Sequence, residues 1–327
     1  MRLHRLLIAT AAVGVLLALP AAATELGDDA PPLKVEKWLK GGPVDLAAGK
    51  GKSIHLVEFW ATWCGPCRRS IPHLTEVQKK FKDKGVVVIG VSVDEDKKRK
   101  TRDKVEEFVK EQGDKMEYAV ALDDKDRSTD KAYMEEFKCE GIPTAFLVDK
   151  AGKLVWLGHP DEAEPVLEQV LAGEWDLVKA KKDDKERRAE VEKRQKVEKA
   201  LTEYFELARA DEKPANLEKA GEETLAAVGK DAMALNQLAW TILDDPEVKH
   251  RDLKFALKVA KLAYDACEGK EAAIVDTYAR ALWDTGDKKE AIEYQKKAVK
   301  LAKDSKAPDE LTEDLEQTLK RYQKEAK

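Results

Sequence analysis

The sequence predicts an α/β fold, a central mixed sheet flanked by helices, followed by an all-α region of helical repeats. Three observations support this prediction. Short apolar runs alternate with helical patterns through the first half of the chain. Two cysteines, Cys64 and Cys67, stand where one apolar run meets a helical pattern. In the second half, alanine pairs recur every 35 or 36 residues, close to the period of stacked helical hairpins.

The first residues have the pattern of a secretory signal peptide. Arg2 and Arg5 precede an apolar run, and small residues ending at Ala23 supply a cleavage site. The run is shorter than the ~20 apolar residues of a spanning helix, so a retained membrane anchor is the weaker alternative. We therefore expect residues 1–23 to be removed and residues 24–32 to form a flexible lead. The mature protein should be exported and soluble, as in a bacterial periplasm.

Composition limits the classes of function. A length of 327 residues suggests about two domains. Charged residues make up 38% of the chain, against about 25% in ordinary domains, which predicts much helix with a charged exterior. The formal charge of −5 gives no reason to propose nucleic-acid binding. Because two of the four cysteines share one CxxC motif, little cysteine remains for structural disulfides.

The first domain is expected over residues 33–175. Gly41 and Gly42 predict the turn of a short hairpin ahead of the first core strand. The β-branched run at residues 54–58 predicts a buried strand, and the run at 86–93 predicts a strand covered on both faces. Further strands are expected at 118–122, within the run 139–149 and at 154–158, the last as the antiparallel partner of the one before it. The mixed charges at 94–100 predict a solvated loop rather than a metal or phosphate site.

Cys64 is placed to be a nucleophile. As the last residue before a helix, it would face unpaired backbone N–H groups and the positive end of the helix dipole, and both favour thiolate. Cys67 lies one turn behind it, close enough to form a disulfide and release a captured group. Pro66 fits the first turn of a helix. Half of a zinc site is the alternative, but Cys139 and Cys267 are single and stand near no histidine pair, so we expect no metal.

Three further residues, Glu58, Pro143 and Cys139, each allow more than one interpretation. Glu58 falls within an apolar strand, where burial would raise its pKa; the alternative is a solvent face of an edge strand. Pro143 begins an apolar run, which signals an edge, a bulge or a cis peptide. Cys139 is expected to be a buried, inert thiol, and a third redox cysteine is the alternative.

The second half of the chain begins with a change in amino-acid composition. Residues 176–199 are almost wholly charged, with acid-before-base pairs four apart such as Asp183 with Arg187 and Asp184 with Arg188, which predict a charged helical connector. Residues 200–327 carry the alanine repeat, with a lengthened turn at 244–248. The pairs are Ala220 with Ala227, Ala256 with Ala263, and Ala291 with Ala298. An ordinary helical bundle is the alternative to a repeat.

The motifs resemble a known family. The segment at residues 58–68, followed by Ile71-Pro72 and by Gly141-Ile142-Pro143-Thr144, resembles the thioredoxin superfamily, and most closely its exported TlpA/ResA branch. The repeat at residues 276–292 resembles a tetratricopeptide repeat. The first resemblance covers about half of the chain.

The resemblance implies a thioredoxin-like fold and an activity. It implies that Pro143 is cis and lies beside the CxxC motif, where the backbone of Ile142 can pair with an extended client segment. It also implies that Glu58 accepts the proton of Cys67. We expect Trp63, Gly65 and Pro66 to contact the client as well. Some relatives act in cytochrome c maturation.

The expected function is therefore that of an exported thiol:disulfide oxidoreductase. Its redox group would be the Cys64/Cys67 pair itself, without another cofactor, and its substrates protein disulfides. Re-reduction would require a membrane thiol donor. The Gly-Pro pair between the cysteines resembles reducing members, which favours reductase over oxidase. The repeats would recruit a protein or peptide partner. The alternative function is a protein-binding scaffold to which the redox domain is auxiliary.

Overall fold

A computed structural model describes residues 23–95, 101–212 and 214–326. The chain divides into two compact units, Met1–Arg188 and Ala189–Lys327. Apart from Ala23, the expected signal peptide lies outside the described residues, as does most of the charged run that follows the predicted strand at 86–93. Among the described residues, no helix combines the length and the apolar character needed to cross a bilayer.

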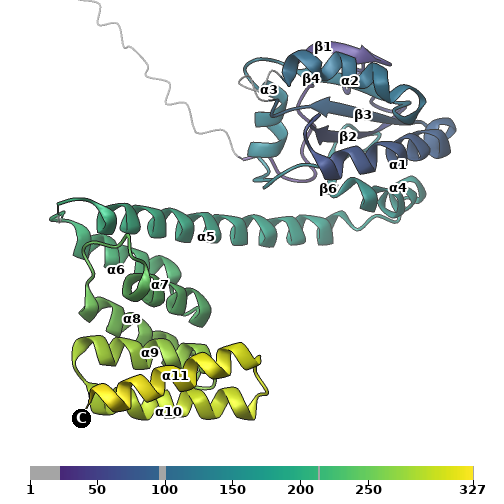
Figure 1. Ribbon diagram of the computed structural model, residues 1–327. Helices are drawn as coiled ribbons and strands as arrows, with labels where there is room; N and C mark the ends of the chain where they lie inside the picture. Colours follow the sequence, from purple (N-terminus) through teal and green to yellow (C-terminus); the bar gives the residue numbers. More distant parts are fainter. Residues whose placement is uncertain (1–22, 96–100, 213, 327) are drawn as a thin grey trace, which may run out of the picture. The chain divides into compact units, whose positions relative to one another are not determined.

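Unit 1 is built on a mixed sheet (Figure 1). Its described residues form six strands in the order β1-β4-β3-β2-β5-β6. The central strand β2 pairs with β3 in parallel and with β5 in antiparallel orientation. The strands are β1 (Val35–Lys40), β2 (Ile54–Trp60), β3 (Val86–Ser92), β4 (Ala119–Asp123), β5 (Thr144–Val148) and β6 (Leu154–Gly158). The expected core strands are confirmed, because their apolar runs are long enough to be buried on both faces of the sheet.

Helices cover both faces of this sheet. One face packs against α1 (Gly65–Phe81), α2 (Val105–Gln112) and α4 (Ala163–Ala172), whose apolar side chains share one core cluster with Leu56 and Trp60. The other face packs against one continuous helical segment, made of α3 (Ser128–Asp130) and the π-helical turn Lys131–Glu135 that follows it. It also packs against the start of α5 (Leu177–Arg209). Short 3-10 turns cover Lys82–Lys84, Arg102–Lys104, Gly113–Lys115 and Pro160–Glu162. The layered arrangement confirms the predicted thioredoxin-like fold.

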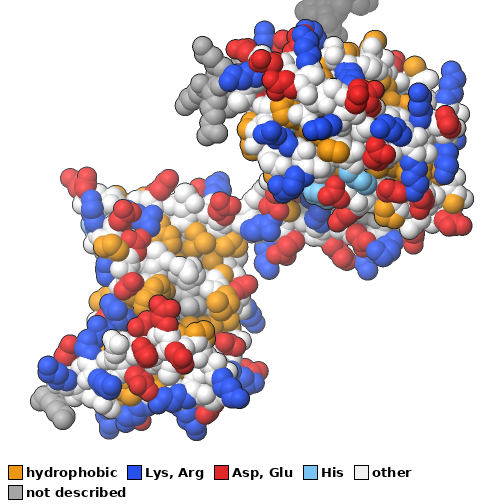
Figure 2. Space-filling view, turned by 45° about the vertical axis from the view of Figure 1, so that its right-hand side comes forward, with side chains coloured by type: hydrophobic (Ala, Val, Ile, Leu, Met, Phe, Trp, Pro, Cys, Tyr) orange, Lys and Arg blue, Asp and Glu red, His pale blue; other side chains and the backbone are white. Residues whose placement is uncertain are grey.

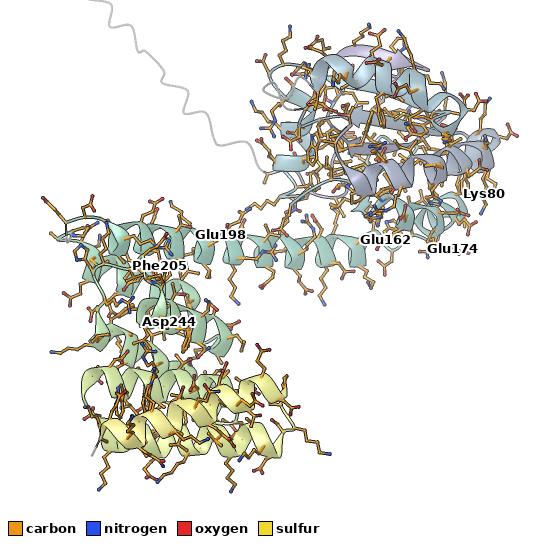
Figure 3. The ribbon with its side chains drawn as sticks, in the orientation of Figure 1. Lys80, Glu162, Glu174, Glu198, Phe205 and Asp244 are labelled. Atoms are coloured by element: carbon orange, nitrogen blue, oxygen red, sulfur yellow. A yellow bond between two sulfur atoms is a disulfide. The ribbon has the colours of Figure 1, made fainter. Side chains whose placement is uncertain are left out.

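The packing of α1 against α4 is reinforced at the surface. Lys80, in the last turn of α1, forms ion pairs with Glu164 and, at 2.9 Å, with Glu168 of α4 (Figure 3). Exposed pairs of this kind contribute little stability each. The apolar contacts beneath them are therefore what fixes α1 and the cysteines at its N-terminus.

The predicted hairpin at Gly41 and Gly42 is wrong. The strand before these glycines, β1, pairs in antiparallel orientation with β4, and no strand of the described chain begins directly after the turn. Two glycines before a proline allow a sharp change of direction without a two-stranded ribbon. The local turn signal was correct, but the pairing partner lies about 80 residues away in the sequence.

The described residues of unit 2 contain the rest of α5 and six more helices. These are α6 (Leu217–Val228), α7 (Ala232–Asp244), α8 (Leu253–Ala266), α9 (Ala272–Thr285), α10 (Lys288–Asp304) and α11 (Asp309–Glu325). The predicted alanine pairs fall on α6, α8 and α10. The pairs on α8 and α10 are fully buried, whereas the pair on α6 is partly exposed. Small residues let neighbouring helices approach closely, so this pattern supports stacked hairpins.

The hairpins share an apolar core. Phe205, near the end of α5, packs beside Tyr204, whose ring also contacts Phe255 of α8 (Figure 3). The lengthened turn between α7 and α8 is organised by Arg251, which donates hydrogen bonds to the carbonyls of Leu243, Val248 and Asp245. The inserted residues therefore form a defined turn between packed helices. On the visible face of this unit, hydrophobic side chains lie among the charged ones (Figure 2).

Candidate active site around the Cys64–Cys67 disulfide

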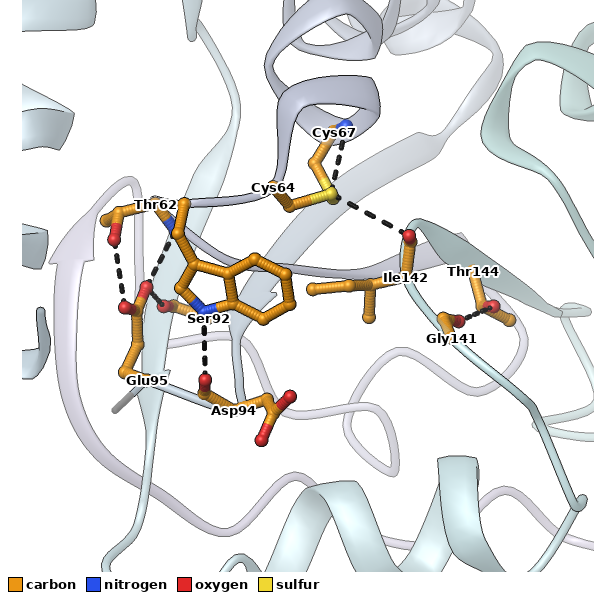
Figure 4. The surroundings of a disulfide bond; sticks show 10 residues. Thr62, Cys64, Cys67, Ser92, Asp94, Glu95, Gly141, Ile142 and Thr144 are labelled. Atoms are coloured by element: carbon orange, nitrogen blue, oxygen red, sulfur yellow. Dashed lines mark hydrogen bonds between the residues drawn. A yellow bond between two sulfur atoms is a disulfide. The ribbon is translucent and has the colours of Figure 1, made fainter. Parts of the chain in front are cut away.

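Cys64 stands at the N-cap of α1, directly after the loop that follows β2. Its backbone is extended, and its sulfur accepts a hydrogen bond from the backbone N–H of Cys67, with 3.1 Å between the two atoms (Figure 4). A helix N-terminus offers unpaired N–H groups and a positive dipole end, which stabilise negative charge on a sulfur. Pro66 occupies the first turn of the helix. The local geometry is therefore suited to holding a thiolate at residue 64.

The two cysteines form a disulfide and differ in their surroundings. Cys64 is joined to Cys67 across one turn of α1. Cys64 is 3% exposed and lines a surface pocket, whereas Cys67 is fully buried among apolar side chains. An incoming sulfur therefore meets Cys64 first.

The segment before β5 passes beside Cys64. The peptide bond between Ile142 and Pro143 is cis, as the resemblance implied, and β5 lies between β2 and β6 rather than at an edge. The carbonyl oxygen of Ile142 lies 3.7 Å from the sulfur of Cys64 (Figure 4). A disulfide sulfur carries no proton, so this is a contact in the oxidised protein. The reduced thiol could donate a hydrogen bond there.

The disulfide pocket is a cavity of about 460 Å³ between the start of α1 and the segment before β5. It brings together four of the five residues predicted to contact a client: Trp63, Gly65, Pro66 and Ile142. Pro143 follows Ile142 directly. Its other lining residues are Cys64, Val93, Asp94, Arg127, Asp130, Met134, Glu135, Cys139, Glu140 and Gly141. The sequence motifs therefore converge on one surface depression.

Comparison with known proteins agrees with this geometry. A family model described as Redoxin matches residues 25–171. The thiol-disulfide oxidoreductase ResA of Bacillus thuringiensis subsp. konkukian is 34% identical over 147 residues, which cover 45% of this chain and 77% of ResA. The chain belongs to the ResA-like thiol-disulfide oxidoreductases. This finding confirms the resemblance and identifies the chain as a redox enzyme.

Other comparisons cover the same region or the repeats. Protein FixW of Rhizobium leguminosarum is 28% identical over 158 residues, 47% of this chain and 70% of FixW. A solved thioredoxin domain of a thiol-disulfide oxidoreductase from Bacteroides vulgatus is 32% identical, with a TM-score of 0.37, and the match covers 45% of this chain and 99% of that one. A tetratricopeptide repeat model matches residues 275–305. It confirms a repeat of this type in unit 2.

The carboxylate of Glu95 organises the loop that carries the cysteines of this ResA-like chain. It accepts hydrogen bonds from the backbone N–H and the hydroxyl of Thr62, at 2.7 and 2.9 Å, and from the hydroxyl of Ser92 at 3.0 Å (Figure 4). The mixed charges at 94–100 predict a solvated loop, so this anchoring role of Glu95 is not evident from composition. The available signal was its position three residues after the end of the buried strand β3, since such residues often lie at the site end of a sheet.

Trp63 is held beside the pocket by the same turn. Its indole N–H donates to the carbonyl oxygen of Asp94 over 3.0 Å, and the side chain remains 47% exposed. Asp94 adopts a positive φ of 53°, which turns its carbonyl toward the indole. A large apolar ring kept in water next to a reactive disulfide is an available contact surface for a client.

Glu58 lies inside unit 1 on the same side of the sheet as Cys67. It is fully buried in the central strand β2, and its neighbours at two-residue spacing, Leu56 and Trp60, belong to the core cluster that contains Cys67. The alternative of a solvent-facing Glu58 is therefore wrong. Neither carboxyl oxygen has a hydrogen-bond partner among the described protein atoms.

Burial controls the protonation of Glu58. Loss of water, with a smaller contribution from the charge of Asp161, raises the pKa of this carboxyl from 4.5 to about 8. The hydroxyl of Tyr118 and the indole N–H of Trp60 are also buried without a protein partner. At neutral pH most Glu58 carboxyls are therefore protonated while the disulfide is closed.

The other two cysteines, Cys139 and Cys267, are free thiols and partly buried. Cys139 lines the disulfide pocket, but burial raises the pKa of its thiol to about 12. The thiol form is a poor nucleophile, so the expectation of an inert thiol is supported. Cys267 is partly buried after α8, with its sulfur 3.3 Å from the carbonyl oxygen of Tyr264.

Proposed function

We propose that this chain is an exported reductase of protein disulfides. The observation that carries the proposal is the placement of the Cys64 sulfur at the N-terminus of α1, next to the Ile142 carbonyl and open to the disulfide pocket. Export is supported by the signal-like pattern of the first residues. The direction of reaction is supported by the Gly-Pro pair between the cysteines.

The proposed reaction has two exchange steps. In the reduced enzyme, the Cys64 thiolate attacks one sulfur of a client disulfide, which breaks the client S–S bond and expels the other client sulfur as a thiolate. The Cys67 thiol loses its proton, and its sulfur attacks Cys64 and releases the second client thiolate. The client gains two electrons, and the enzyme is left with its disulfide. A thiol donor at the membrane would then restore the dithiol.

Glu58 is proposed as the proton acceptor for Cys67. It lies on the face of β2 that packs against α1, and its pKa of about 8 is close to the range in which a carboxylate and a thiol exchange protons readily. Pairing of an extended client segment with the backbone at Ile142 would hold the mixed disulfide in the pocket. Trp63, Gly65 and Pro66 would contact the same segment.

The experiment is the reduction of insulin by dithiothreitol in the presence of the protein lacking residues 1–23. The wild-type chain should accelerate precipitation of the insulin B chain, and Cys64→Ser should not. Cys67→Ala should instead accumulate a mixed disulfide on Cys64, because the resolving sulfur is missing. Equal rates for wild type and Cys64→Ser would refute the assignment.

A second function, partner recruitment, is supported by a groove in unit 2. We name it the repeat groove; it has a volume of about 760 Å³ and crosses α7, α9 and α11. Its lining mixes cations, acids, amides and a tryptophan: Asn236, Gln237, Trp240, Ala273, Asp276, Thr277, Arg280, Leu311, Asp314, Leu315, Gln317, Thr318 and Arg321. Such a surface suits an extended peptide better than a small apolar ligand.

Recruitment can be separated from redox chemistry. The experiment is a pull-down in which the full chain carrying both Cys64→Ser and Cys67→Ser is the bait. Without these two cysteines, no partner is retained through a disulfide to the CxxC motif. Thr318→Arg places a long cation in the groove and should abolish retention, whereas Thr312→Arg, on α11 but outside the groove lining, should not. Retention that survives Thr318→Arg would place the partner elsewhere. If recruitment is intact but insulin reduction fails, the scaffold function is the better description.

A further inference from the structure

The end of the helical segment before the disulfide pocket requires capping. The segment starts with α3, and its last helical hydrogen bonds include those from Phe137 N–H to the Tyr133 carbonyl and from Cys139 N–H to the Met134 carbonyl. Lys138 has a positive φ of 50°, which ends the helical path. The last carbonyls of a helix have no partner within it, so those of residues 136–138 depend on donors from elsewhere.

Two arginines of α5 supply these donors. Arg187 donates to the carbonyl oxygens of Phe137, at 2.5 Å, and Lys138, at 3.2 Å. Arg188 donates to the carbonyl oxygen of Glu136 at 3.1 Å. The positive guanidinium groups also complement the negative end of the helical segment. Three successive terminal carbonyls are thus capped from one side.

Asp184 orients both arginines. Its two oxygens accept hydrogen bonds of 2.7 Å, one from Arg187 and the other from Arg188, and its side chain is only 8% exposed. The Arg188 guanidinium lies 4.0 Å from the centre of the fully buried Phe137 ring. Asp184 is buried and the two arginines are partly buried, so this hydrogen-bonded set of charges has few alternative geometries, since leaving any member unpaired is costly.

This part of α5 belongs to unit 1 by its packing. Leu177 and Ala180 contact the core cluster on the same face of the sheet as Phe137, and Asp184 and Arg188 follow at helical spacing. The expected pair between Asp183 and Arg187 is not formed: Asp183 pairs with Lys179, and Arg187 turns to Asp184. The charges of Asp184, Arg187 and Arg188 therefore face protein, although the composition of the segment suggested a solvated connector.

The capped segment leads directly into the disulfide pocket. Met134, Glu135 and Cys139 line the pocket from this segment, and Ile142 follows three residues after Cys139. We propose that Asp184, Arg187 and Arg188 are positioning residues for client binding: they fix the end of the helical segment and so hold the 139–142 loop at the distance from Cys64 that backbone pairing requires. The proposal rests on the proposed client site at Ile142. It extends the functional redox module into α5.

The first test compares a client with a small reagent, using the full chain. Arg187→Ala should lower kcat/KM for a disulfide-bonded dye-quenched peptide by about tenfold, mainly through KM, because one misplaced binding loop weakens client alignment. Alkylation of the reduced Cys64 by iodoacetamide, which needs no loop, should change less than about twofold. For Arg187→Lys, which keeps one donor group, kcat/KM for the peptide should fall between the values of Arg187→Ala and wild type. Lys185→Ala, an exposed change on the same helix, should match wild type.

The second test measures the loop directly by hydrogen exchange. Amides of residues 139–142 should exchange faster in Arg187→Ala, while those of β2 keep their protection. Unchanged peptide kinetics and unchanged loop exchange would overturn the proposal. Equal losses in peptide reduction and Cys64 alkylation, together with faster exchange in β2, would also overturn it, because they would show a general loss of fold. If wild type failed to reduce the peptide, the proposed function would be wrong, and loop exchange would still decide the capping role.

Discussion

Replacing Glu58 with glutamine should make unit 1 more stable at neutral pH, by an amount that depends on pH. The carboxyl has a pKa of about 8 in the folded chain against an ordinary 4.5. Below pH 4.5 it is protonated in both folded and unfolded chains. Between 4.5 and about 8 only the unfolded chain ionises, so the free energy of unfolding falls as pH rises, and above 8 it falls no further.

The size of the effect follows from the same two pKa values. Each pH unit between them corresponds to about 1.4 kcal/mol, so the full effect is about 5 kcal/mol. Between pH 5 and pH 7.5, the advantage of Glu58→Gln over wild type should therefore grow by about 3 kcal/mol. Glutamine has nearly the same shape as glutamate and does not ionise. The ionisation of Glu58 in the unfolded chain is therefore the main difference between the two proteins.

The assay is urea unfolding of the oxidised proteins at several pH values, followed by tryptophan fluorescence. Taking the difference between the variants at each pH cancels the titration of all other groups, which the two chains share. Glu174→Gln, the loss of an exposed acid in unit 1, is the matched control (Figure 3). A difference between Glu58→Gln and wild type that stays flat from pH 5 to pH 8 would refute the assignment of a buried, proton-holding carboxyl.

Two further substitutions test other parts of the site. Cys139→Ser should leave the rate of insulin reduction within about twofold of wild type, because a thiol with a pKa of about 12 is not a nucleophile at neutral pH; a large loss would revive a redox role. Glu95→Ala should destabilise unit 1 by about 1–3 kcal/mol, since the amide of Thr62 loses its charged acceptor. Thermal unfolding measures this loss, and an unchanged melting temperature would mean that water replaces the carboxylate without cost.

The cysteine pair could be located from the sequence because its signals are local. Three signals that lie within a short stretch of sequence indicate the position of Cys64. They are a β-branched run, a cysteine at the following N-cap and a proline in the first turn of the helix. The same run favoured a buried Glu58 but left a solvent face of an edge strand open, and the burial of every residue of β2 in the structure excludes that alternative. Short-range signals were enough to locate the cysteines, whereas the orientation of Glu58 needed the whole sheet.

The surroundings of the pair depended on contacts that no local pattern contains. Asp184 and Arg188 were predicted as an ion pair on a solvated helix, and the pair exists, but its burial against Phe137 depends on packing between segments about 50 residues apart. The same holds for Glu95. Its charge and its place after a strand predict a solvated residue, but in the folded chain it accepts a hydrogen bond from Thr62, 33 residues away in the sequence. Mixed charge therefore indicates a helix or loop more reliably than it indicates solvent.

If Glu58 exchanges a proton with Cys67 as proposed, the unequal burial of the two sulfurs would give it opposite tasks in the two halves of the cycle. When an electron donor opens the disulfide at Cys64, the sulfur of Cys67 leaves with a negative charge in an apolar core, where an isolated charge is costly. A protonated Glu58, favoured by its pKa of about 8, can neutralise that charge. During client reduction Cys67 must lose the proton again, and the same carboxylate can take it back, as microscopic reversibility requires. One buried acid with a pKa near that of a thiol can therefore serve both directions, whereas an exposed carboxylate with an ordinary pKa could serve neither well.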